Sequence, residues 1–481
     1  MLRSAGIYFA TRVLAAMFAL LAVAVFTRLV PPETYGVYTL VMSTAIGIFA
    51  VAYQWLRASV LRFVPGKNGM PRATLEAALA GYLVVSIALT LIVAIAVAIG
   101  LVSIDGAILA LAVAITLLYA AMEIVLACWQ AKKKPVIYAV LTLGRAGGVL
   151  VISAGLALAG FGAVGLLAGA LLANALPLLV ARLFFAARLP ELHFDRTHLR
   201  TIASFGLPLG LVGIGGTIIG LSDRYLIAWL IGVDAAGAYA APYDLAQRSL
   251  SVLMLSAFLA YSPHVFGSWA DDEHDKCHEA IRAQLSLSLA FSLPVAIVMA
   301  AASPLVSSIL FGEAFHESAA SVLPWIVLAS LLQGIQSYYI SYGFTLPKRA
   351  GTNAAIVIGG ALLNLPLNLL LIPPLGIVGA AIATIASYAT VLAVSIMVTR
   401  RWIHLPWPVG DTVRVVLSCL AALPFVLIAG RSTSILHGLL WLVPAGAVIL
   451  ALYAASDTFG LRTRVLGALG RTRAHNAPER K

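Results

Sequence analysis

Apolar runs of about 20 residues recur along the whole chain and alternate with short segments that carry most of the charges. Each run is long enough to cross a hydrocarbon core of about 30 Å as an α-helix. We count about fourteen such runs, so the chain is predicted to be an all-α polytopic membrane protein. The predicted spans begin near Ile7, Tyr35, Ala77, Ala107, Pro135, Phe161, Ala203, Ala235, Ile281, Ala319, Thr352, Leu375, Asp411 and Ser434.

The composition indicates that lipid is the solvent of this fold. Of the 481 residues, 62% are hydrophobic and only 10% are charged, and the mean hydropathy is +1.00. In soluble proteins only about half of the residues are apolar. The longest polar segments have only about 20 residues, which leaves room for transport and little room for a catalytic head.

The positions of Lys and Arg predict the topology, because cytoplasmic loops of membrane proteins carry an excess of both. With the N-terminus inside, 24 of the 31 basic residues fall in inside segments, Arg57 among them in the loop after the second span, and only Arg28 and Arg431 fall clearly in outside loops. Both termini are therefore predicted to be cytoplasmic. The net charge of +12 then lies mainly beside anionic lipid headgroups and does not indicate nucleic acid as a partner.

Two pairs of segments indicate an internal repeat. "PPETYGVYTLV" (31–41) resembles "GVDAAGAYAAP" (232–242), and "GFGAVGLLAGALL" (160–172) resembles "PLGIVGAAIATIA" (374–386). The copies lie 201 and 214 residues apart, with six spans between them, so the repeats share one orientation. We expect two six-helix lobes around a central cavity, then two further spans and a basic cytoplasmic tail. The predicted domains are 1–200, 201–402, 403–456 and 457–481.

The segments "TRLVPPETYGVYTLV", "SDRYLIAWLIGVDAAGAYAAPYDL" and "LNLPLNLLLIPPLGIVGAAIATIASY" carry a family resemblance. The chain resembles the polysaccharide transporter branch of the multidrug/oligosaccharidyl-lipid/polysaccharide (MOP) superfamily, which includes Wzx-type O-antigen and exopolysaccharide flippases. The resemblance covers the first twelve spans and implies a MATE-like fold. It further implies a flippase in the bacterial inner membrane that moves undecaprenyl-pyrophosphate-linked oligosaccharides from the cytoplasmic to the periplasmic leaflet. Such a flippase serves O-antigen (lipopolysaccharide), exopolysaccharide or capsule synthesis, and a polysaccharide polymerase and chain-length machinery are candidate partners.

Seven charged residues lie inside the apolar runs. A charge at the centre of a membrane helix costs about 2.5 to 3.5 kcal/mol on insertion scales, so it normally faces a cavity or a partner. The four cations outnumber the three acids, and a positively biased cavity suits a diphosphate. The seven residues are Arg12, Glu123, Arg145, Asp223, Arg224, Asp244 and Arg248.

Arg145 and Arg12 have no acidic residue three or four positions away. A guanidinium stays charged and holds phosphate oxygens through two parallel hydrogen bonds, so Arg145 is a candidate pyrophosphate ligand. The alternative is an interhelical ion pair with Glu123, which is also our candidate for a protonation site that couples transport to a proton gradient. Arg12 either receives an anionic headgroup or extends to the membrane interface.

Two further charge pairs lie around residue 230. Asp244 and Arg248 stand four positions apart, where they neutralise each other, unless substrate phosphate competes for Arg248. The adjacent Asp223 and Arg224 point about 100° apart on a helix. The family resemblance places them where the seventh span meets the opposite lobe, so we expect Arg224 to bind pyrophosphate and Asp223 to act as its anchor or gate partner. The alternative is a salt bridge that joins the seventh and eighth spans through Arg248.

The run "LLQGIQSYYISYGF" places Gln333, Gln336 and Tyr339 at three-residue spacing. Amides can bind sugar hydroxyls and tyrosine rings can stack on sugars, which makes the three residues candidate glycan contacts, although tyrosines also populate ordinary membrane interfaces. Asn364 and Asn368 are expected to form interhelical hydrogen bonds.

Signals for metals, cofactors and catalysis are absent from the sequence. The segment "DDEHDKCHE" (271–279) contains His274, Cys277 and His278 but lacks further ordered ligands, so we interpret it as a solvated loop. No phosphate-binding loop, zinc-protease motif or nucleophile elbow is present. The three cysteines lie far apart and predict no disulfide framework. We therefore expect neither a cofactor nor an enzyme.

The predicted mechanism is alternating access of the two lobes. Two rival functions share part of the pattern. A MATE-like multidrug exporter would carry cations, which the excess of arginine disfavours. A membrane polysaccharide polymerase or glycosyltransferase would need a larger outside loop with catalytic residues.

Overall fold

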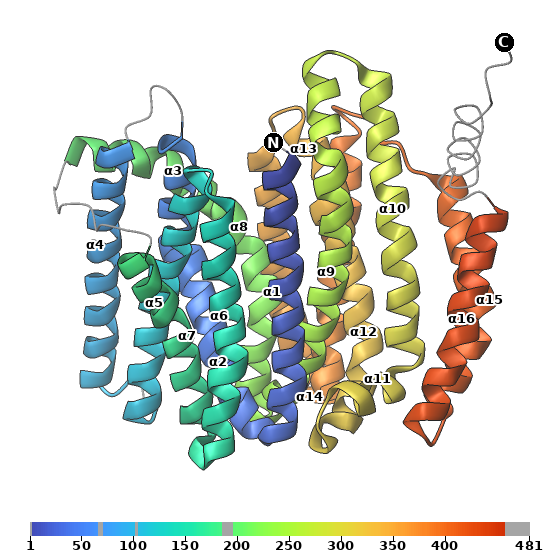
Figure 1. Cartoon of the computed structure of the whole chain (residues 1–481), viewed down its shortest axis with the longest axis horizontal. Helices are drawn as coiled ribbons and strands as arrows, with labels where there is room; N and C mark the ends of the chain where they lie inside the picture. The colour runs from blue at the N-terminus through green and yellow to red at the C-terminus, as the bar shows by residue number, and fades with distance from the viewer. Residues whose placement is uncertain (1, 66–70, 102–103, 185–195, 457–481) are drawn as a thin grey trace, which may run out of the picture. The chain divides into compact units, whose positions relative to one another are not determined.

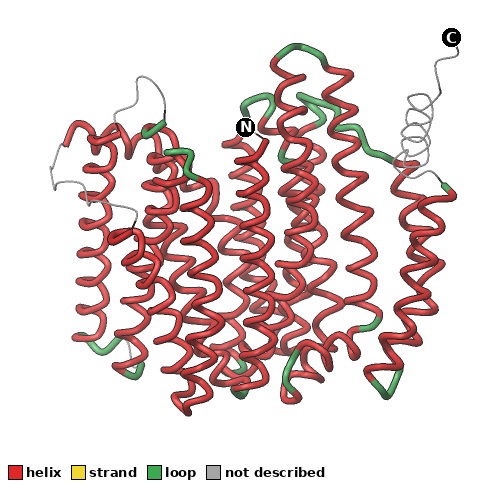
Figure 2. Tube along the Cα trace, viewed as in Figure 1, coloured by secondary structure: helices red, strands yellow, loops and turns green. Residues whose placement is uncertain are grey.

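The computed structural model describes residues 2–65, 71–101, 104–184 and 196–456, and within these ranges it contains helices and no strand (Figures 1 and 2). The predicted basic tail, 457–481, lies outside the described residues. The helices are α1 (Leu2–Leu29), α2 (Pro32–Ile48), η1 (Phe49–Tyr53), α3 (Gln54–Phe63), α4 (Pro71–Ala98), α5 (Gly106–Ala131), α6 (Pro135–Leu156), η2 (Ala157–Phe161), α7 (Gly162–Phe184), α8 (Arg196–Leu230), α9 (Val233–Ala270), α10 (His274–Ala301), α11 (Ser303–Leu310), η3 (Glu313–Phe315), α12 (His316–Ile335), η4 (Gln336–Ile340), α13 (Tyr342–Thr345), α14 (Ala350–Thr399), α15 (Val409–Arg431) and α16 (Ile435–Ala455).

The prediction of about fourteen spans agrees with these helices. Among the described residues, eleven helical stretches have the length and composition to cross a membrane. Two of the eleven, Pro135–Phe184 and Ala350–Thr399, are 50 residues long and each contains a break that divides it into two spans. The 35-residue α8 is not among the eleven but, at about 50 Å, is long enough to cross as well. Together these stretches make fourteen spans.

The two breaks support the internal repeat. Gly162 has φ 52° and ψ −132°, and Gly376, its counterpart in the repeat, has φ 60° and ψ −142°. Both backbones thus take a conformation that is open almost only to glycine, because it lacks a Cβ atom. Two sequence segments 214 residues apart therefore turn the chain back in the same way.

The helices form two compact units, of which the first comprises Met1–Leu245, Phe311–Ser318 and Ala350–Val391. Within it, α6 packs against α7 and α1, and α3 packs against α5 and α8. The π-helical turn η1 joins α2 to α3, so that Pro32–Phe63 continues as one span. This packing places α3, α5 and α6 side by side.

The second unit comprises Ala246–Leu310, Ala319–Arg349 and Leu392–Lys481. Here α15 packs against α16, α10 and α11. The core of this contact contains Leu305 of α11 together with Cys419, Ala422 and Val426 of α15. The last two spans, which have no counterpart in the repeat, are therefore anchored on α10 and α11.

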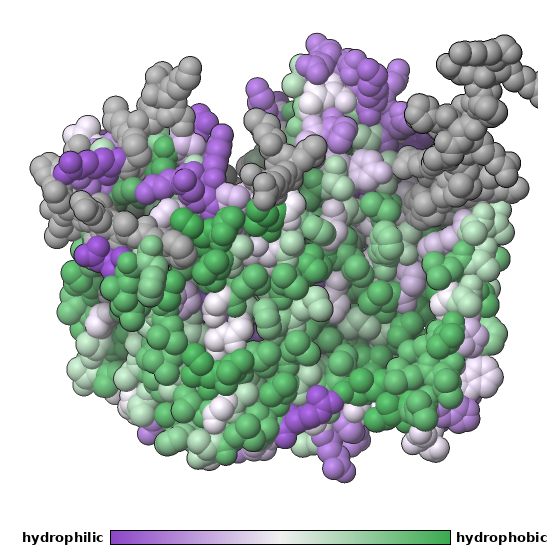
Figure 3. All heavy atoms as spheres, in the orientation of Figure 1, coloured by the Kyte–Doolittle hydropathy of each residue, from purple (hydrophilic) through white to green (hydrophobic). Residues whose placement is uncertain are grey.

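The outward faces of the helices are apolar in each unit. Exposed side chains include Val84, Leu91 and Ile95 on α4 and Leu440 and Val443 on α16. Figure 3 shows hydrophobic surface along the length of such helices, with hydrophilic residues gathered near their ends. Large contiguous apolar surface of this kind is unfavourable in water and suits hydrocarbon.

Candidate functional site

Three charged side chains meet inside the first unit, and we call them the Glu123 cluster. Arg145 Nη1 of α6 donates to Glu123 Oε1 of α5 at 2.8 Å, and Arg57 Nε of α3 lies 3.7 Å from Glu123 Oε2. Two guanidinium groups therefore share one carboxylate, which leaves one positive charge unneutralised by the cluster itself.

An aromatic ring beside the Glu123 cluster stabilises the charge of Arg145, and the side chains of the cluster are partly exposed. The guanidinium carbon of Arg145 lies 5.5 Å from the centre of the Tyr119 ring, which is one turn before Glu123 on α5. An aromatic face attracts a cation in this position. The side chains of Arg57, Glu123 and Arg145 are 27%, 15% and 20% exposed, so none of the three is completely enclosed.

The structure resolves part of what the sequence left open at this cluster. The interhelical ion pair between Arg145 and Glu123 is present, and the role of Arg145 as a pyrophosphate ligand stays a prediction. Sequence reasoning placed Arg57 in a cytoplasmic loop, but α3 continues to Phe63 and carries Arg57 inside the second span. Arg57 lies only four residues after Tyr53, so extending the second span by one helical turn would have placed it inside the span.

A second group of charges, the Arg224 cluster, consists of Ser43, Arg224, Tyr243 and Asp244. Arg224 Nη2 of α8 donates to Asp244 Oδ1 of α9, and Arg224 Nη1 donates to Ser43 Oγ of α2 at 3.2 Å. The guanidinium carbon also lies 5.4 Å from the centre of the Tyr243 ring. The carboxylate that pairs with Arg224 in this structure is thus Asp244, and the role of Asp223 as an anchor or gate partner stays a prediction.

Asp223 faces hydrogen-bond donors that are neutral. The Tyr239 hydroxyl donates to Asp223 Oδ2 at 2.8 Å and the Thr384 hydroxyl donates to the same oxygen at 2.5 Å. Asn368 Nδ2 of α14 donates to Asp223 Oδ1 at 2.8 Å. Asp223 is fully buried, and these bonds join α8 to α9 and α14. Asn368 bonds Asp223 and Asn364 bonds Ser222, so both asparagines form the interhelical hydrogen bonds that were expected of them. The helical geometry explains the separation, since adjacent residues point about 100° apart.

The remaining candidate cations are Arg12 and Arg248. Arg12 is half-buried on α1, and Arg248 is half-buried on α9, one turn beyond Asp244. Their roles as pyrophosphate ligands stay predictions.

The glycan candidates lie in the second unit and are more enclosed than the sequence suggested. Gln247 Nε2 donates to Gln333 Oε1 at 3.3 Å, and Gln336 Nε2 donates to Ser395 Oγ at 3.1 Å. The Tyr339 ring packs edge-on against Trp407, with 5.5 Å between the ring centres. Gln336 and Tyr339 are buried in the π-helical turn η4, where the helix is locally widened.

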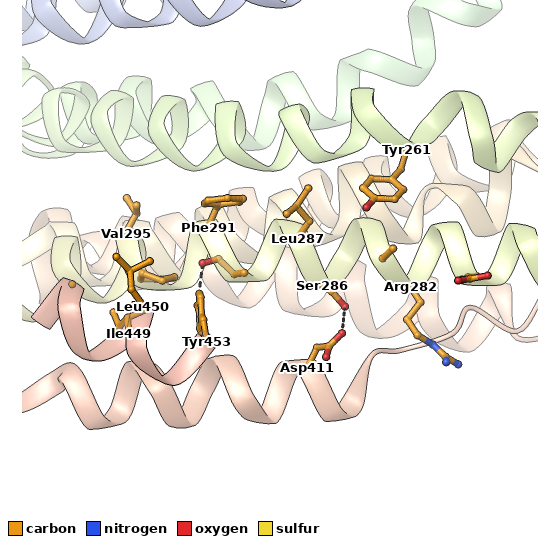
Figure 4. Close-up of a pocket in the computed structure, with 15 residues that line it drawn as sticks. Tyr261, Arg282, Ser286, Leu287, Phe291, Val295, Asp411, Ile449, Leu450 and Tyr453 are labelled. Carbon is orange, nitrogen blue, oxygen red and sulfur yellow. Dashed lines mark hydrogen bonds between the residues drawn. The ribbon is translucent and has the colours of Figure 1, made fainter. Parts of the chain in front are cut away.

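A groove with a cavity volume of about 600 Å³ runs along the second unit beside α15 and α16. Figure 4 shows Leu287, Phe291 and Val295 of α10 along its length and Arg282 toward one end. At the same end, the Ser286 hydroxyl donates to Asp411 Oδ2 at 2.7 Å. The groove therefore combines an apolar wall with a polar end, which is the chemistry of a lipid.

The segment that was considered for metal binding is a helix and not a loop. Residues from His274 onward form the first turns of α10, and Cys277 is buried. Among the described residues no group of three or more His, Cys, Asp and Glu side chains could hold a metal ion.

Known proteins match this chain at the level of family and fold. A family model described as "Polysaccharide biosynthesis protein" matches residues 25–320. An uncharacterized membrane protein of Methanocaldococcus jannaschii, MJ1068, is 26% identical over 201 residues; the match covers 40% of this chain and 38% of that protein's length.

Solved structures match over most of the chain. The lipid II flippase MurJ in an inward closed conformation aligns with a TM-score of 0.78 at 13% identity, covering 95% of this chain and 98% of that one. An inward-facing MATE family multidrug transporter of the MOP superfamily aligns with a TM-score of 0.58 at 14% identity, covering 82% of this chain and 98% of that one. A MOP superfamily transporter from Pyrococcus furiosus aligns with a TM-score of 0.55 at 14% identity, covering 83% and 94% of the two chains.

The family model confirms the resemblance to polysaccharide biosynthesis proteins, and the solved structures confirm the MATE-like fold. Two of the solved proteins that share this fold over most of the chain are described as a flippase and a multidrug transporter.

Proposed function

Because the chain belongs to the polysaccharide biosynthesis protein family, we propose that it is a flippase for undecaprenyl-pyrophosphate-linked oligosaccharides. The observation that carries the proposal is the Glu123 cluster, in which Arg57 and Arg145 share one carboxylate inside the membrane spans. An excess of positive charge in this position favours an anionic headgroup and disfavours the organic cations of a multidrug exporter.

In the proposed binding step, the pyrophosphate takes the place of Glu123 between the two arginines. Each guanidinium presents planar N–H donors that match phosphate oxygens, so the exchange replaces one charged acceptor with another and leaves no buried cation unpaired. Glu123 recaptures the arginines when the headgroup leaves. In the empty site, the carboxylate offsets one of the two positive charges. It also competes with the headgroup for the arginines, which weakens headgroup binding and allows the cargo to be released.

Other parts of the molecule support a lipid-linked cargo. We assign Arg12 and Arg248 as further cations that the headgroup meets, and Gln333, Gln336 and Tyr339 as glycan contacts once the headgroup has entered. The groove beside α15 and α16 has the apolar wall that a polyprenyl chain needs.

Transport proceeds by alternating access between the repeats 1–200 and 201–402, with both termini in the cytoplasm. The oligosaccharide moves from the cytoplasmic to the periplasmic leaflet of the bacterial inner membrane, where O-antigen, exopolysaccharide or capsule synthesis uses it. A polysaccharide polymerase and chain-length machinery are the proposed partners there.

The test is translocation of a fluorescent undecaprenyl-pyrophosphate oligosaccharide in proteoliposomes. We expect the wild type to flip the lipid and Arg145→Ala to lose about ten- to a hundredfold in rate, the effect of removing a charge-assisted hydrogen bond. Arg145→Lys should recover only part of the rate, because an ammonium group cannot form the bidentate contact.

Arg72→Ala is the matched control. Arg72 also pairs with a glutamate, Glu76, at 2.8 Å, but its side chain is 71% exposed on α4, so its removal should leave the rate unchanged. A wild type that flips no such lipid and instead exports a cationic dye would replace the flippase with the exporter.

A further inference from the structure

The helices α2 and α9 begin at the same end of the first unit and cross there at two glycines. A Cβ atom on Gly36 would overlap the carbonyl oxygen of Val233, and a Cβ atom on Gly237 would overlap the carbonyl oxygen of Pro32. The two contacts are reciprocal, because Pro32 and Val233 are separated by the same 201 residues as Gly36 and Gly237. The repeats thus meet at this end through equivalent residues, as two subunits do at a two-fold axis.

Deeper along the same helices, a second pair of equivalent positions is joined by one side chain. Ser43 on α2 and Asp244 on α9 are also 201 residues apart, and Arg224 contacts both. The neighbouring Tyr225 hydroxyl shares a hydrogen bond with Thr44 at 2.9 Å. Contacts of α8 and α9 with α2 therefore continue from the glycine crossing into the membrane.

The burial of Arg224 argues against a role as an open phosphate ligand. Its side chain is only 7% exposed, against 20% for Arg145, and its charge is neutralised by Asp244. Replacing a buried ion pair by apolar residues often costs no stability, so the presence of such a pair is better explained by a requirement to form and break in a defined geometry.

We propose that the Gly36–Gly237 crossing and the contact of Arg224 with Ser43 and Asp244 form a latch that closes the outer ends of α2 and α9. The inference rests on the alternating access proposed above, in which the two repeats separate at each side of the membrane in turn. The end with the latch is the outer one by the distribution of Lys and Arg. Glycine allows the two backbones to touch when the latch is closed, and Arg224 determines the register in which they touch.

The experiment measures access to Thr39, which lies on α2 between the crossing and Ser43 and is buried. Thr39→Cys is made in a chain whose Cys128, Cys277 and Cys419 are replaced by Ala, and intact cells are treated with a membrane-impermeant maleimide. We expect slow labelling in the parent and a rise of about tenfold or more when Asp244→Ser removes the carboxylate, since the open population rises with the loss of the pair.

The repeat supplies a specific rescue. In the variant that combines Ser43→Asp with Asp244→Ser, Arg224 again faces a carboxylate, now at the equivalent position of the other helix, and labelling should return toward the parent rate. A cysteine at Thr116, equally buried on α5, is the control and should stay unlabelled in every variant.

The outcomes separate the latch from the flippase. An unchanged labelling rate in Asp244→Ser, in protein that elutes as a folded species, would overturn the latch. If that variant does not fold, Ser43→Ala takes its place with an expected rise of about fivefold, the effect of about 1 kcal/mol. Failure of the exchange variant to restore slow labelling would also count against the latch. Labelling needs no substrate, so a latch that opens as expected in a protein that flips no lipid overturns the proposed function alone.

Discussion

The Glu123 cluster and the Arg224 cluster both combine arginine with a carboxylate, at a ratio of two to one in the first and one to one in the second. In the first, two arginines share one carboxylate and all three side chains are partly exposed. In the second, one arginine is paired with a carboxylate, hydrogen-bonded to a serine and packed against a tyrosine, and it is almost completely buried. An arginine in a membrane span is therefore not by itself a ligand for phosphate. The ratio of arginine to carboxylate and the exposure of the arginine side chain distinguish a site that binds phosphate from a contact that holds two helices together.

The largest expected effect is on the stability of the protein, which should fall more when the arginine of the Arg224 cluster is replaced than when Arg145 of the Glu123 cluster is replaced. Arg224→Met removes an almost buried guanidinium from its contacts with Asp244 and Ser43 and should lower the free energy of unfolding by about 3 to 5 kcal/mol, whereas Arg145→Met should cost less because Arg145 is more exposed and Glu123 keeps Arg57. Thermal unfolding in detergent measures the difference. Combining Arg224→Met with Asp244→Leu should restore most of the stability, and equal losses in the two single variants would remove the distinction between the clusters.

The sequence predicted the elements of the fold well and the contacts of the site only in part. Hydropathy placed the helix starts within seven residues, with the largest differences at α8, predicted near Ala203 and found at Arg196, and at α10, predicted near Ile281 and found at His274. These differences arise because polar turns extend both helices beyond the hydrocarbon, where a search for apolar runs does not follow them. The same effect placed Arg57 in a loop.

The partners of the charged residues were harder to predict, because a sequence shows which residues share a helix face but not which helices touch. The pair of Arg145 with Glu123 was among the alternatives, since Glu123 was the only acid on the adjacent span. The pair of Arg224 with Asp244 was not. Adjacent and four-residue spacings suggested local partners, whereas the packing of α8 against α9 supplied a distant one.

The next effect distinguishes the two arginines within the Glu123 cluster. Arg57→Ala should lower the rate of lipid translocation about fivefold, less than Arg145→Ala, because Arg57 lies 3.7 Å from the carboxylate and Arg145 lies at 2.8 Å. In the same proteoliposome assay the double variant should lose less than the product of the single losses, since both residues bind one group. A loss equal to the product would indicate that the arginines bind separate groups.

The smallest effect concerns the carboxylate between the arginines. Glu123→Gln removes the anion that competes with the headgroup, so the binding of inorganic pyrophosphate, measured by calorimetry in detergent, should strengthen about two- to fivefold, as expected for a partly exposed ion pair of up to about 1 kcal/mol. Translocation should nevertheless slow, because the arginines would no longer regain a partner when the headgroup leaves. Asp244→Asn is the contrasting variant, since it should leave pyrophosphate binding unchanged if Arg224 belongs to the latch. Stronger pyrophosphate binding in Asp244→Asn but not in Glu123→Gln would reverse the assignment of the two clusters.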